Sequence, residues 1–212
     1  MPSELVMLVD DDPSVAKSLN RVFRSVGLDV ETYASGESFL TREPPNCPSC
    51  LVLDVRMPDT SGLDLQETLN QNKMEIPIVF ITGHADVPTS VRAMKAGAVD
   101  FIEKPFRPQE LLDAVRRAIA RDSERRVELG RRAKIEERFL TLTPRERQVF
   151  GLVASGLPNK QVAFELGASE KTIKVHRGRV MQKMRADSLP ALVRMADGVR
   201  FDKPFSPGTP RH

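Results

Sequence analysis

The sequence predicts a doubly wound α/β domain with a five-stranded parallel sheet, followed by a small all-α domain of the helix-turn-helix type. In residues 1–120, short apolar runs alternate with amphipathic stretches of helical period, as parallel strands and their crossover helices do. Residues 141–200 contain helical patterns alone. The charge also changes sign, because residues 1–120 hold 12 Lys or Arg against 18 Asp or Glu, whereas residues 121–212 hold 20 against 11. A basic second domain makes nucleic acid a candidate partner.

Length and composition exclude several classes of protein. With 212 residues, of which 40% are hydrophobic, the chain is able to bury a core in two domains. No apolar run approaches the roughly 18 residues of a membrane span, and residues 1–4 carry no export-signal pattern. Cys47 and Cys50 are too few for a disulfide framework or a structural zinc site, so we expect a loop residue and a buried strand residue. We therefore expect a cytoplasmic protein with no membrane partner.

Five apolar runs are predicted to form the strands of the sheet. They are Leu5–Val9, Leu28–Tyr33, Leu51–Leu53, Ile76–Ile81 and Val99–Ile102. Four of them are nearly continuous in apolar residues, which is typical of strands buried on both faces. The run at 28–33 alternates with polar residues and indicates a more exposed strand.

Amphipathic stretches between these runs predict the crossover helices. In the first stretch, apolar residues recur at helical spacing from Val15 to Val26, with Asp12 as the N-cap and Pro13 at the first helical position. Similar patterns predict helices near 35–41, 63–72, 87–96 and 108–120. Function in such sheets gathers at the carboxyl ends of the strands.

The rest of the chain divides into three parts. Residues 121–140 are dense in Arg and Glu and predict a solvated helical linker, which a second copy of the chain could pair with. Residues 141–200 form the second domain, with four short helical patterns. Residues 201–212 are rich in Pro, Gly and Ser and predict a disordered tail.

Polar residues follow four of the predicted strands. Asp10 and Asp11 follow the first strand, Asp54 follows the third, Thr82 ends the fourth, and Lys104 follows the fifth. Because parallel strands end at the same edge of a sheet, we expect the carboxylates to crowd together, which raises their pKa values unless a cation neutralises them. Mg²⁺ or Mn²⁺ suits such oxygen ligands. With one hydroxyl and one ammonium added, the site suits a phosphoryl group, and a carboxylate there can form an aspartyl phosphate.

These strand ends resemble the receiver domain of two-component response regulators over roughly residues 4–120. The motifs are Asp10-Asp11, Asp54-Val-Arg-Met-Pro-Asp-Thr-Ser-Gly, Thr82-Gly-His and Phe101-Ile-Glu-Lys104-Pro105-Phe. The resemblance implies the flavodoxin-like fold of CheY and a phosphoacceptor at Asp54. It also implies that Asp10, Asp11, Asp54 and the backbone carbonyl of Arg56 bind Mg²⁺.

The same resemblance implies roles for the remaining pocket residues. Lys104 would pair with the phosphoryl group and precede a cis peptide to Pro105. Thr82 would donate a hydrogen bond to the phosphoryl group and form the switch pair with Phe101. Because Phe stands where Tyr is commoner, we expect repositioning of the ring rather than of a hydroxyl. The implied chemistry is limited to self-catalysed phosphotransfer and autodephosphorylation, so we do not expect a conventional enzyme.

The second domain carries a helix-turn-helix pattern. Thr143 and Glu146 form a capping box around Pro144, and a second short helix starts at Asn159. After a turn at Gly167, Ser169 caps a longer helix that ends near residue 184. Two helices joined by a tight turn place the second helix in the major groove of DNA.

The longer helix has two different faces. Its predicted core face holds Ile173, Val180, Met181 and Met184, and its opposite face holds Lys171, Lys174, Val175, Gly178, Arg179 and Gln182. Residues 169–185 contain six basic residues and one acidic residue, which suits phosphate contacts. Val175 suits either contact with a thymine methyl group or simple surface placement.

Three motifs resemble the LuxR-type helix-turn-helix of NarL/FixJ regulators, and the FixJ branch most closely. They are Leu142-Thr-Pro-Arg-Glu146, Asn159-Lys160-Gln-Val-Ala and Thr172-Ile-Lys-Val-His176. The resemblance implies a dimerising helix after Ser188 and a set of DNA contacts. The implied contact residues are Asn159, Lys160, Lys171, Thr172, Lys174, Val175, His176, Arg179 and Lys183. For His176, a DNA-facing position and a structural position both stay open.

The function predicted from these features is that of a two-component response regulator. A cognate sensor histidine kinase would phosphorylate Asp54, and the resulting homodimer would bind promoter double-stranded DNA, with RNA polymerase as a further candidate partner. Two alternatives stay open. Asp10-x-Asp12-x-Ser14 loosely matches the nucleophile motif of haloacid-dehalogenase-type, Mg²⁺-dependent phosphatases. A receiver protein that acts through protein contacts only is the other alternative.

Overall fold

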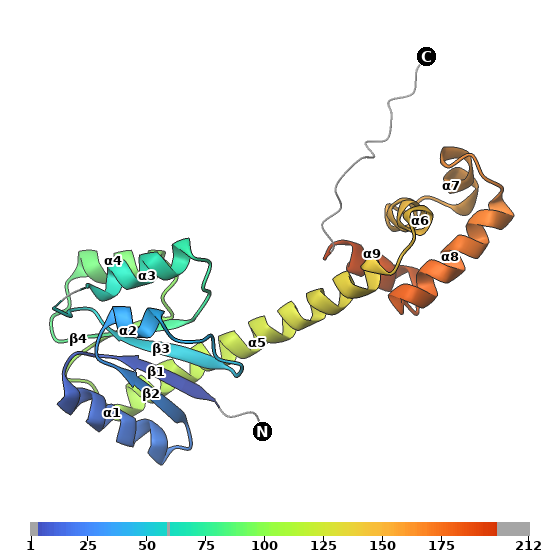
Figure 1. The fold of residues 1–212 in the computed structure, drawn as a ribbon. Coiled ribbons are helices and arrows are strands. Elements are labelled where there is room, and N and C mark those ends of the chain that lie inside the picture. Colours follow the sequence, from blue (N-terminus) through green and yellow to red (C-terminus); the bar gives the residue numbers. More distant parts are fainter. Residues whose placement is uncertain (1–3, 59, 199–212) are drawn as a thin grey trace. The chain divides into compact units, whose positions relative to one another are not determined.

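The computed structural model describes residues 4–58 and 60–198, and it divides the chain into two compact units (Figure 1). The first unit is Met1–Val127 and the second is Glu128–His212. The division falls inside the predicted linker at 121–140. The predicted tail at 201–212 lies outside the described residues.

The first unit contains the predicted five-stranded parallel sheet. Its strands are β1 (Leu5–Val9), β2 (Asp29–Tyr33), β3 (Ser49–Asp54), β4 (Ile78–Thr82) and β5 (Asp100–Glu103). All pairs are parallel, in the order β2-β1-β3-β4-β5. Strand β4 begins two residues later than predicted, because Pro77 has no N–H to pair within a central strand. The order places the carboxyl ends of β1 and β3 side by side.

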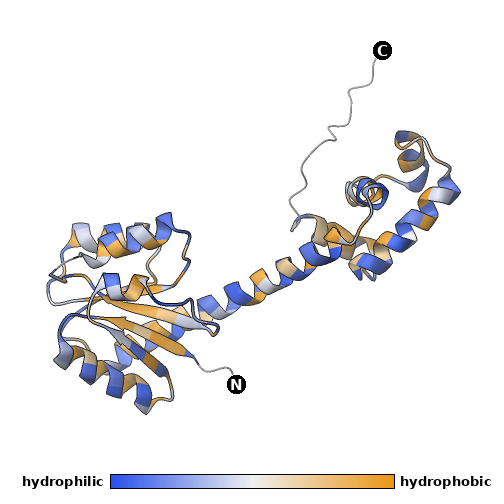
Figure 2. Cartoon of the chain, viewed as in Figure 1, coloured by the Kyte–Doolittle hydropathy of each residue, from blue (hydrophilic) through white to orange (hydrophobic). Residues whose placement is uncertain are grey.

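Two layers of helices cover the sheet. Helices α1 (Pro13–Ser25) and α5 (Pro108–Leu140) pack on one face, and α2 (Gly36–Leu40), α3 (Gly62–Gln71) and α4 (Val87–Lys95) pack on the other. Strands β1, β3 and β4 are buried along their whole length and stand out in the hydropathy colouring, whereas β2 is largely exposed (Figure 2). This burial explains why these three strands read as continuous apolar runs.

The two cysteines belong to different layers of the first unit. Cys50 lies in β3, fully buried in the layer that contains α1 and α5, whereas Cys47 precedes the strand and packs against the opposite layer. Both thiols are free. The predicted loop residue and buried strand residue are therefore confirmed.

Local caps hold the segments next to the strand ends. The Asp12 carboxylate accepts hydrogen bonds from the backbone N–H groups of Ser14 at 2.7 Å and Val15 at 3.4 Å, as its N-cap position predicts. Helix α1 therefore starts directly after Asp10 and Asp11. The side chain of Asp12 caps the helix and is directed to backbone amides.

The second unit consists of helices packed on the last turns of α5. They are α6 (Pro144–Ala154), α7 (Asn159–Glu165), α8 (Glu170–Met184) and α9 (Leu189–Ala196). Their common core contains Ile135, Leu142, Val149, Phe150, Val153, Val162, Ala163, Ile173, Val180, Met184 and Leu192. The capping box at Thr143 and the N-cap at Ser169 form as predicted, and the helix predicted after Ser188 is present with Ser188 as its N-cap. None of the helices in the described ranges is both long and apolar enough to cross a membrane.

A buried carboxylate attaches α5 to the amino end of β3. Asp122 is 1% exposed, and its Oδ2 accepts a hydrogen bond from the backbone N–H of Ser49 at 3.0 Å. Arg125 and Arg126 approach its two oxygens at 2.7 and 2.6 Å. Burial alone raises the pKa of Asp122, but hydrogen bonds from Arg126, Arg125 and Ser49 outweigh it and hold the pKa below its usual range.

We expect Asp122→Ala to lower the free energy of unfolding of the first unit by about 2–3 kcal/mol, because the hydrogen bonds that three residues donate to a charged group are lost. Tyr33 is the single Tyr of a chain without Trp, and it lies in β2, so its fluorescence during urea denaturation reports on this unit. Glu124→Ala, at an exposed position on the same helix, is the control.

The effect should depend on pH with a defined sign. Since the pKa of Asp122 is lowered in the folded chain, its contribution is present above the unfolded-state value of about 3.9 and is lost as the pH falls through the folded-state value. A difference between wild type and Asp122→Ala that grew toward acid would contradict the assignment.

Candidate functional site

Three carboxylates meet at the carboxyl edge of the sheet. Asp10 and Asp54 are buried and Asp11 is exposed, and one oxygen of each lies within 4.8 Å of the others. The contact follows from the register, which pairs Val9 of β1 with Leu53 of β3. Oxygen Oδ1 of Asp54 is buried without a hydrogen-bond partner among the described residues. Three carboxylate oxygens with one of them unsatisfied fit a hard divalent cation.

Lys104 supplies the positive charge beside these carboxylates. It follows β5, and its Nζ lies 2.9 Å from Asp10 Oδ2 and 3.6 Å from Asp54 Oδ2. Its backbone N–H donates to the carbonyl of Thr82 at 2.6 Å, which ties the end of β5 to the end of β4. The peptide from Lys104 to Pro105 is cis, as predicted. The ammonium is therefore held between two carboxylates that come from different strands.

The surroundings of Asp54 raise the pKa of its carboxyl above the usual range. Burial is the largest cause that raises the pKa of this carboxyl, and Asp10 raises it further. Lys104 and the backbone N–H groups of Arg56 and Val55 lower the pKa, but not enough to cancel the burial. A cation or an electrophile that reached Asp54 would therefore relieve an unfavourable charge.

Thr82 and Phe101, the predicted switch pair, lie on neighbouring strands: Thr82 ends β4, and Phe101 lies within β5 and pairs with Phe80. Thr82 is fully buried, and its hydroxyl donates to the carbonyl of His84 at 3.2 Å and accepts from the N–H of His84 at 3.3 Å. Phe101 is half-buried, with its ring centroid 6.1 Å from that of Phe80. The hydroxyl thus bonds to the loop before α4, and the switch role of the pair stays a prediction.

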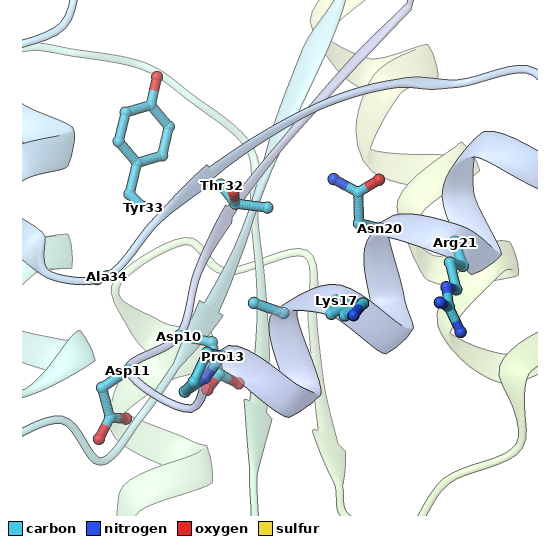
Figure 3. Close-up of a pocket in the computed structure, with 10 residues that line it drawn as sticks. Asp10, Asp11, Pro13, Lys17, Asn20, Arg21, Thr32, Tyr33 and Ala34 are labelled. Atoms are coloured by element: carbon cyan, nitrogen blue, oxygen red, sulfur yellow. The ribbon is translucent and has the colours of Figure 1, made fainter.

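A cleft of about 490 Å³ extends from Asp10 and Asp11 between α1 and β2 (Figure 3). Lys17 and Arg21 project from α1 along this cleft, and Tyr33 projects from β2. The carboxylate edge is therefore open on the side of α1, where a partner could approach it.

Gly62 is a site residue that the sequence analysis missed. A Cβ on this residue would collide with the backbone carbonyl oxygen of Asp54, and its N–H donates to the carbonyl of Val55 at 3.0 Å. Helix α3 can therefore begin directly against the backbone of Asp54 only if its first residue is glycine. The Ser-Gly that closes the motif after Asp54 was the available signal.

The second unit presents most of the predicted DNA contacts on one exposed face. Lys171, Thr172, Lys174, Val175 and Arg179 are all exposed on α8. The predicted core face is buried at Ile173, Val180 and Met184 and partly buried at Met181. Lys160 is exposed on α7. The two faces of the longer helix are therefore confirmed.

The other three residues that were predicted to contact DNA are bonded to or enclosed by other residues of the second unit. Asn159 accepts a hydrogen bond from Arg177 at 2.9 Å, and Nδ1 of the half-buried His176 is enclosed without a hydrogen-bond partner among the described residues. Lys183 forms an ion pair with Glu146, with 2.6 Å between Nζ and Oε2. DNA contacts by these three residues stay predictions.

Comparisons with known proteins agree with both units. Residues 6–116 match the family model of the response regulator receiver domain, and residues 140–196 match that of bacterial regulatory proteins of the LuxR family. The chain is 54% identical over 193 residues to Nodulation protein W of Bradyrhizobium diazoefficiens, covering 91% of this chain and 85% of the relative. It is 46% identical over 196 residues to the transcriptional regulatory protein FixJ of Rhizobium meliloti, covering 92% and 96%. The chain belongs to the NarL/FixJ family of response regulators.

Solved structures extend the likeness of this response regulator to its fold. The response regulator StyR matches with a TM-score of 0.82 and 47% identity, over 93% of this chain and 100% of that one. Full-length FixJ from B. japonicum matches with a TM-score of 0.57 and 38% identity, over 93% and 98%. The chain is thus a transcriptional regulator with a receiver domain and a LuxR-type DNA-binding domain, which sets aside the alternative of action through protein contacts alone.

In this response regulator, we expect Gly62→Ala to lower the free energy of unfolding of the first unit by about 1–3 kcal/mol, because the added methyl group forces α3 away from Asp54. The measurement is urea denaturation followed by Tyr33 fluorescence. Gly83→Ala is the matched control, since its Cβ meets nothing within 4 Å and should change the value by less than about 0.5 kcal/mol. Equal effects of the two substitutions would contradict the close-approach argument.

Proposed function

We propose that a sensor histidine kinase phosphorylates this response regulator on Asp54, and that the phosphorylated chain dimerises and binds promoter DNA. The observation that carries the proposal is the buried Oδ1 of Asp54, which has no hydrogen-bond partner among the described residues, while Oδ2 of the same carboxylate lies 3.6 Å from the ammonium of Lys104. A carboxylate oxygen that no described protein group satisfies is the atom available to attack phosphorus.

The phosphotransfer step follows from the positions of the pocket residues. Asp54 attacks the phosphorus of a phosphohistidine, so that an O–P bond forms, the N–P bond breaks, and the imidazole of the kinase leaves. Lys104, now 2.9 Å from Asp10, would turn to the phosphoryl oxygens as their charge arrives. Mg²⁺ or Mn²⁺ held by Asp10, Asp11, Asp54 and the carbonyl of Arg56 would neutralise the same oxygens.

Helix α4 offers a surface for the proposed homodimer. Val87, Val91 and Met94 are 74, 43 and 46% exposed, and their spacing places them along one side of the helix. Phosphorylation adds nearly two negative charges at Asp54, and a new hydrogen bond from Thr82 would release its contact with the loop that leads to α4. The Phe101 ring would reposition together with Thr82, which would change the surface available for dimerisation.

The proposed target is the major groove of promoter DNA, in the cytoplasm. The exposed face of α8 carries the basic residues, and two copies in a symmetric dimer would read two half-sites. RNA polymerase is a further proposed partner. Beyond self-catalysed phosphotransfer and autodephosphorylation we propose no catalytic activity, because a phosphatase of the haloacid-dehalogenase type needs Asp12 as a catalytic group, whereas Asp12 caps α1.

We expect Asp54→Asn to abolish the acid-labile acyl phosphate that wild type forms with a small acyl phosphate donor and Mg²⁺. The readouts are radiolabel retained after gel electrophoresis and dimer mass from light scattering. Asp12→Asn is the matched control, because Asn also caps helices and should leave both readouts unchanged. Label that persisted in Asp54→Asn and mapped to Asp10 would overturn the proposal and support the phosphatase.

We expect Lys174→Ala to weaken binding to promoter DNA by about ten-fold in a gel-shift titration. If its contact is to phosphate, the slope of log affinity against log salt falls by about 0.9 as well. Lys134→Ala, on the exposed side of α5, is the control and should change neither quantity. Binding that was insensitive both to Lys174 and to salt would contradict the placement of α8 in the groove.

A further inference from the structure

The last turn of α8 is held by an ion pair between a buried carboxylate and a partly exposed lysine, because the side chain of Glu146 is 3% exposed and that of Lys183 is 35% exposed. Lys183 Nζ lies 2.6 Å from Oε2 of Glu146, and it also donates to the backbone carbonyl of Thr141 at 3.1 Å. Glu146 is 2% exposed and lies in the first turn of α6. A single ammonium therefore connects α8 to the start of α6 and to the segment that follows α5.

Glu146 also takes part in the N-terminal cap of α6. Its Oε2 accepts the N–H of Thr143 at 2.9 Å, and its own N–H donates to the Thr143 hydroxyl at 3.3 Å, which completes the capping box. Lys183 is the first cause that holds the pKa of Glu146 below its usual range. Beside this pair, Arg138 of α5 donates to the carbonyl of Met184 at 3.3 Å. The end of α5, the start of α6 and the end of α8 thus meet at one set of polar contacts.

We propose that Lys183, through Glu146, positions the recognition helix α8, and that it does not act as a phosphate contact. To reach DNA, the ammonium would have to leave a buried carboxylate without its charge partner, which is strongly unfavourable. Lys171 and Lys174 are exposed and reach solvent without such a loss. This proposal rests on the proposed DNA-binding function and deepens it.

The geometry of α8 explains why this anchor would govern recognition. Nine residues separate Lys174 from Lys183, which at 1.5 Å per residue is about 13 Å along the helix. A tilt of about 10° at the anchored end would therefore move Lys174 by about 2 Å, enough to break hydrogen bonds to base edges. Hydrophobic contacts of Ile173 and Val180 hold α8 on the core, but they are less directional than the ion pair.

The test compares Glu146→Gln with Lys183→Met in the full-length phosphorylated chain. The probes are a duplex enriched from a random pool with the wild-type chain and a scrambled duplex of equal length. We expect both variants to lose about ten-fold of the preference for the enriched duplex, and the double variant to lose no more than either single one. We expect the salt slope on the scrambled duplex to stay at the wild-type value in all three.

A phosphate contact at Lys183 predicts the opposite pattern. Lys183→Met would then lower the salt slope by about 0.9 on both duplexes, and Glu146→Gln would release the ammonium and leave DNA affinity unchanged or raised. Either result would overturn the positioning role. Lys174→Ala is the comparison variant for the behaviour of an exposed contact.

Two further outcomes are separable. If Glu146→Gln failed to fold, Lys183→Met would still distinguish the two roles by its salt slope. Lys183→Arg keeps the ion pair, so we expect it to retain the wild-type preference for the enriched duplex. A wild-type chain that bound neither duplex would overturn the proposed DNA-binding function, and the positioning role with it. Wild-type binding together with a reduced slope in Lys183→Met would overturn the positioning role alone.

Discussion

The repulsion among carboxylates at the carboxyl edge of the sheet is the constraint on which the first unit depends. Asp10, Asp11 and Asp54 lie close enough to share one cation, and two of them are buried. Such a cluster persists only because Lys104 balances part of the charge at 2.9 Å and because two apolar layers hold the strands in register. The pocket is thus kept under electrostatic strain, which the arrival of a cation and a phosphoryl group would relieve.

Each unit contains a buried carboxylate beside a lysine, and the two pairs differ in how completely they are satisfied. At the sheet edge, Oδ1 of Asp54 has no hydrogen-bond partner among the described residues and is available for chemistry. In the helical unit, Glu146 accepts from both Lys183 and the N–H of Thr143 and thereby stabilises a helix junction. The same side-chain types therefore leave a buried oxygen available at the sheet edge and connect three segments in the helical unit.

Local physics explains why so much of the fold could be predicted. Caps at Asp12, Thr143, Ser169 and Ser188 involve residues within three positions of one another, so their chemistry is readable from adjacent letters. The meeting of Asp10 with Asp54 at one edge of the sheet could be expected because parallel strands end at the same edge. Contacts between distant residues were not predictable in this way. The ion pair between Lys183 and Glu146 joins residues that are 37 positions apart, and no pattern of neighbouring residues indicates it.

The sequence by itself determined the acidic and basic halves, the strand ends that carry Asp10, Asp54, Thr82 and Lys104, and the exposed face of α8, because each depends on periodicity or on neighbours along the chain. Only the tertiary structure decided which polar groups are satisfied. Within the described ranges it leaves Asp54 Oδ1 without a hydrogen-bond partner, places Gly62 against the backbone of Asp54, and pairs Lys183 with Glu146. The reason is physical: desolvation and partnership depend on what surrounds a side chain in three dimensions, and residue type does not specify those surroundings.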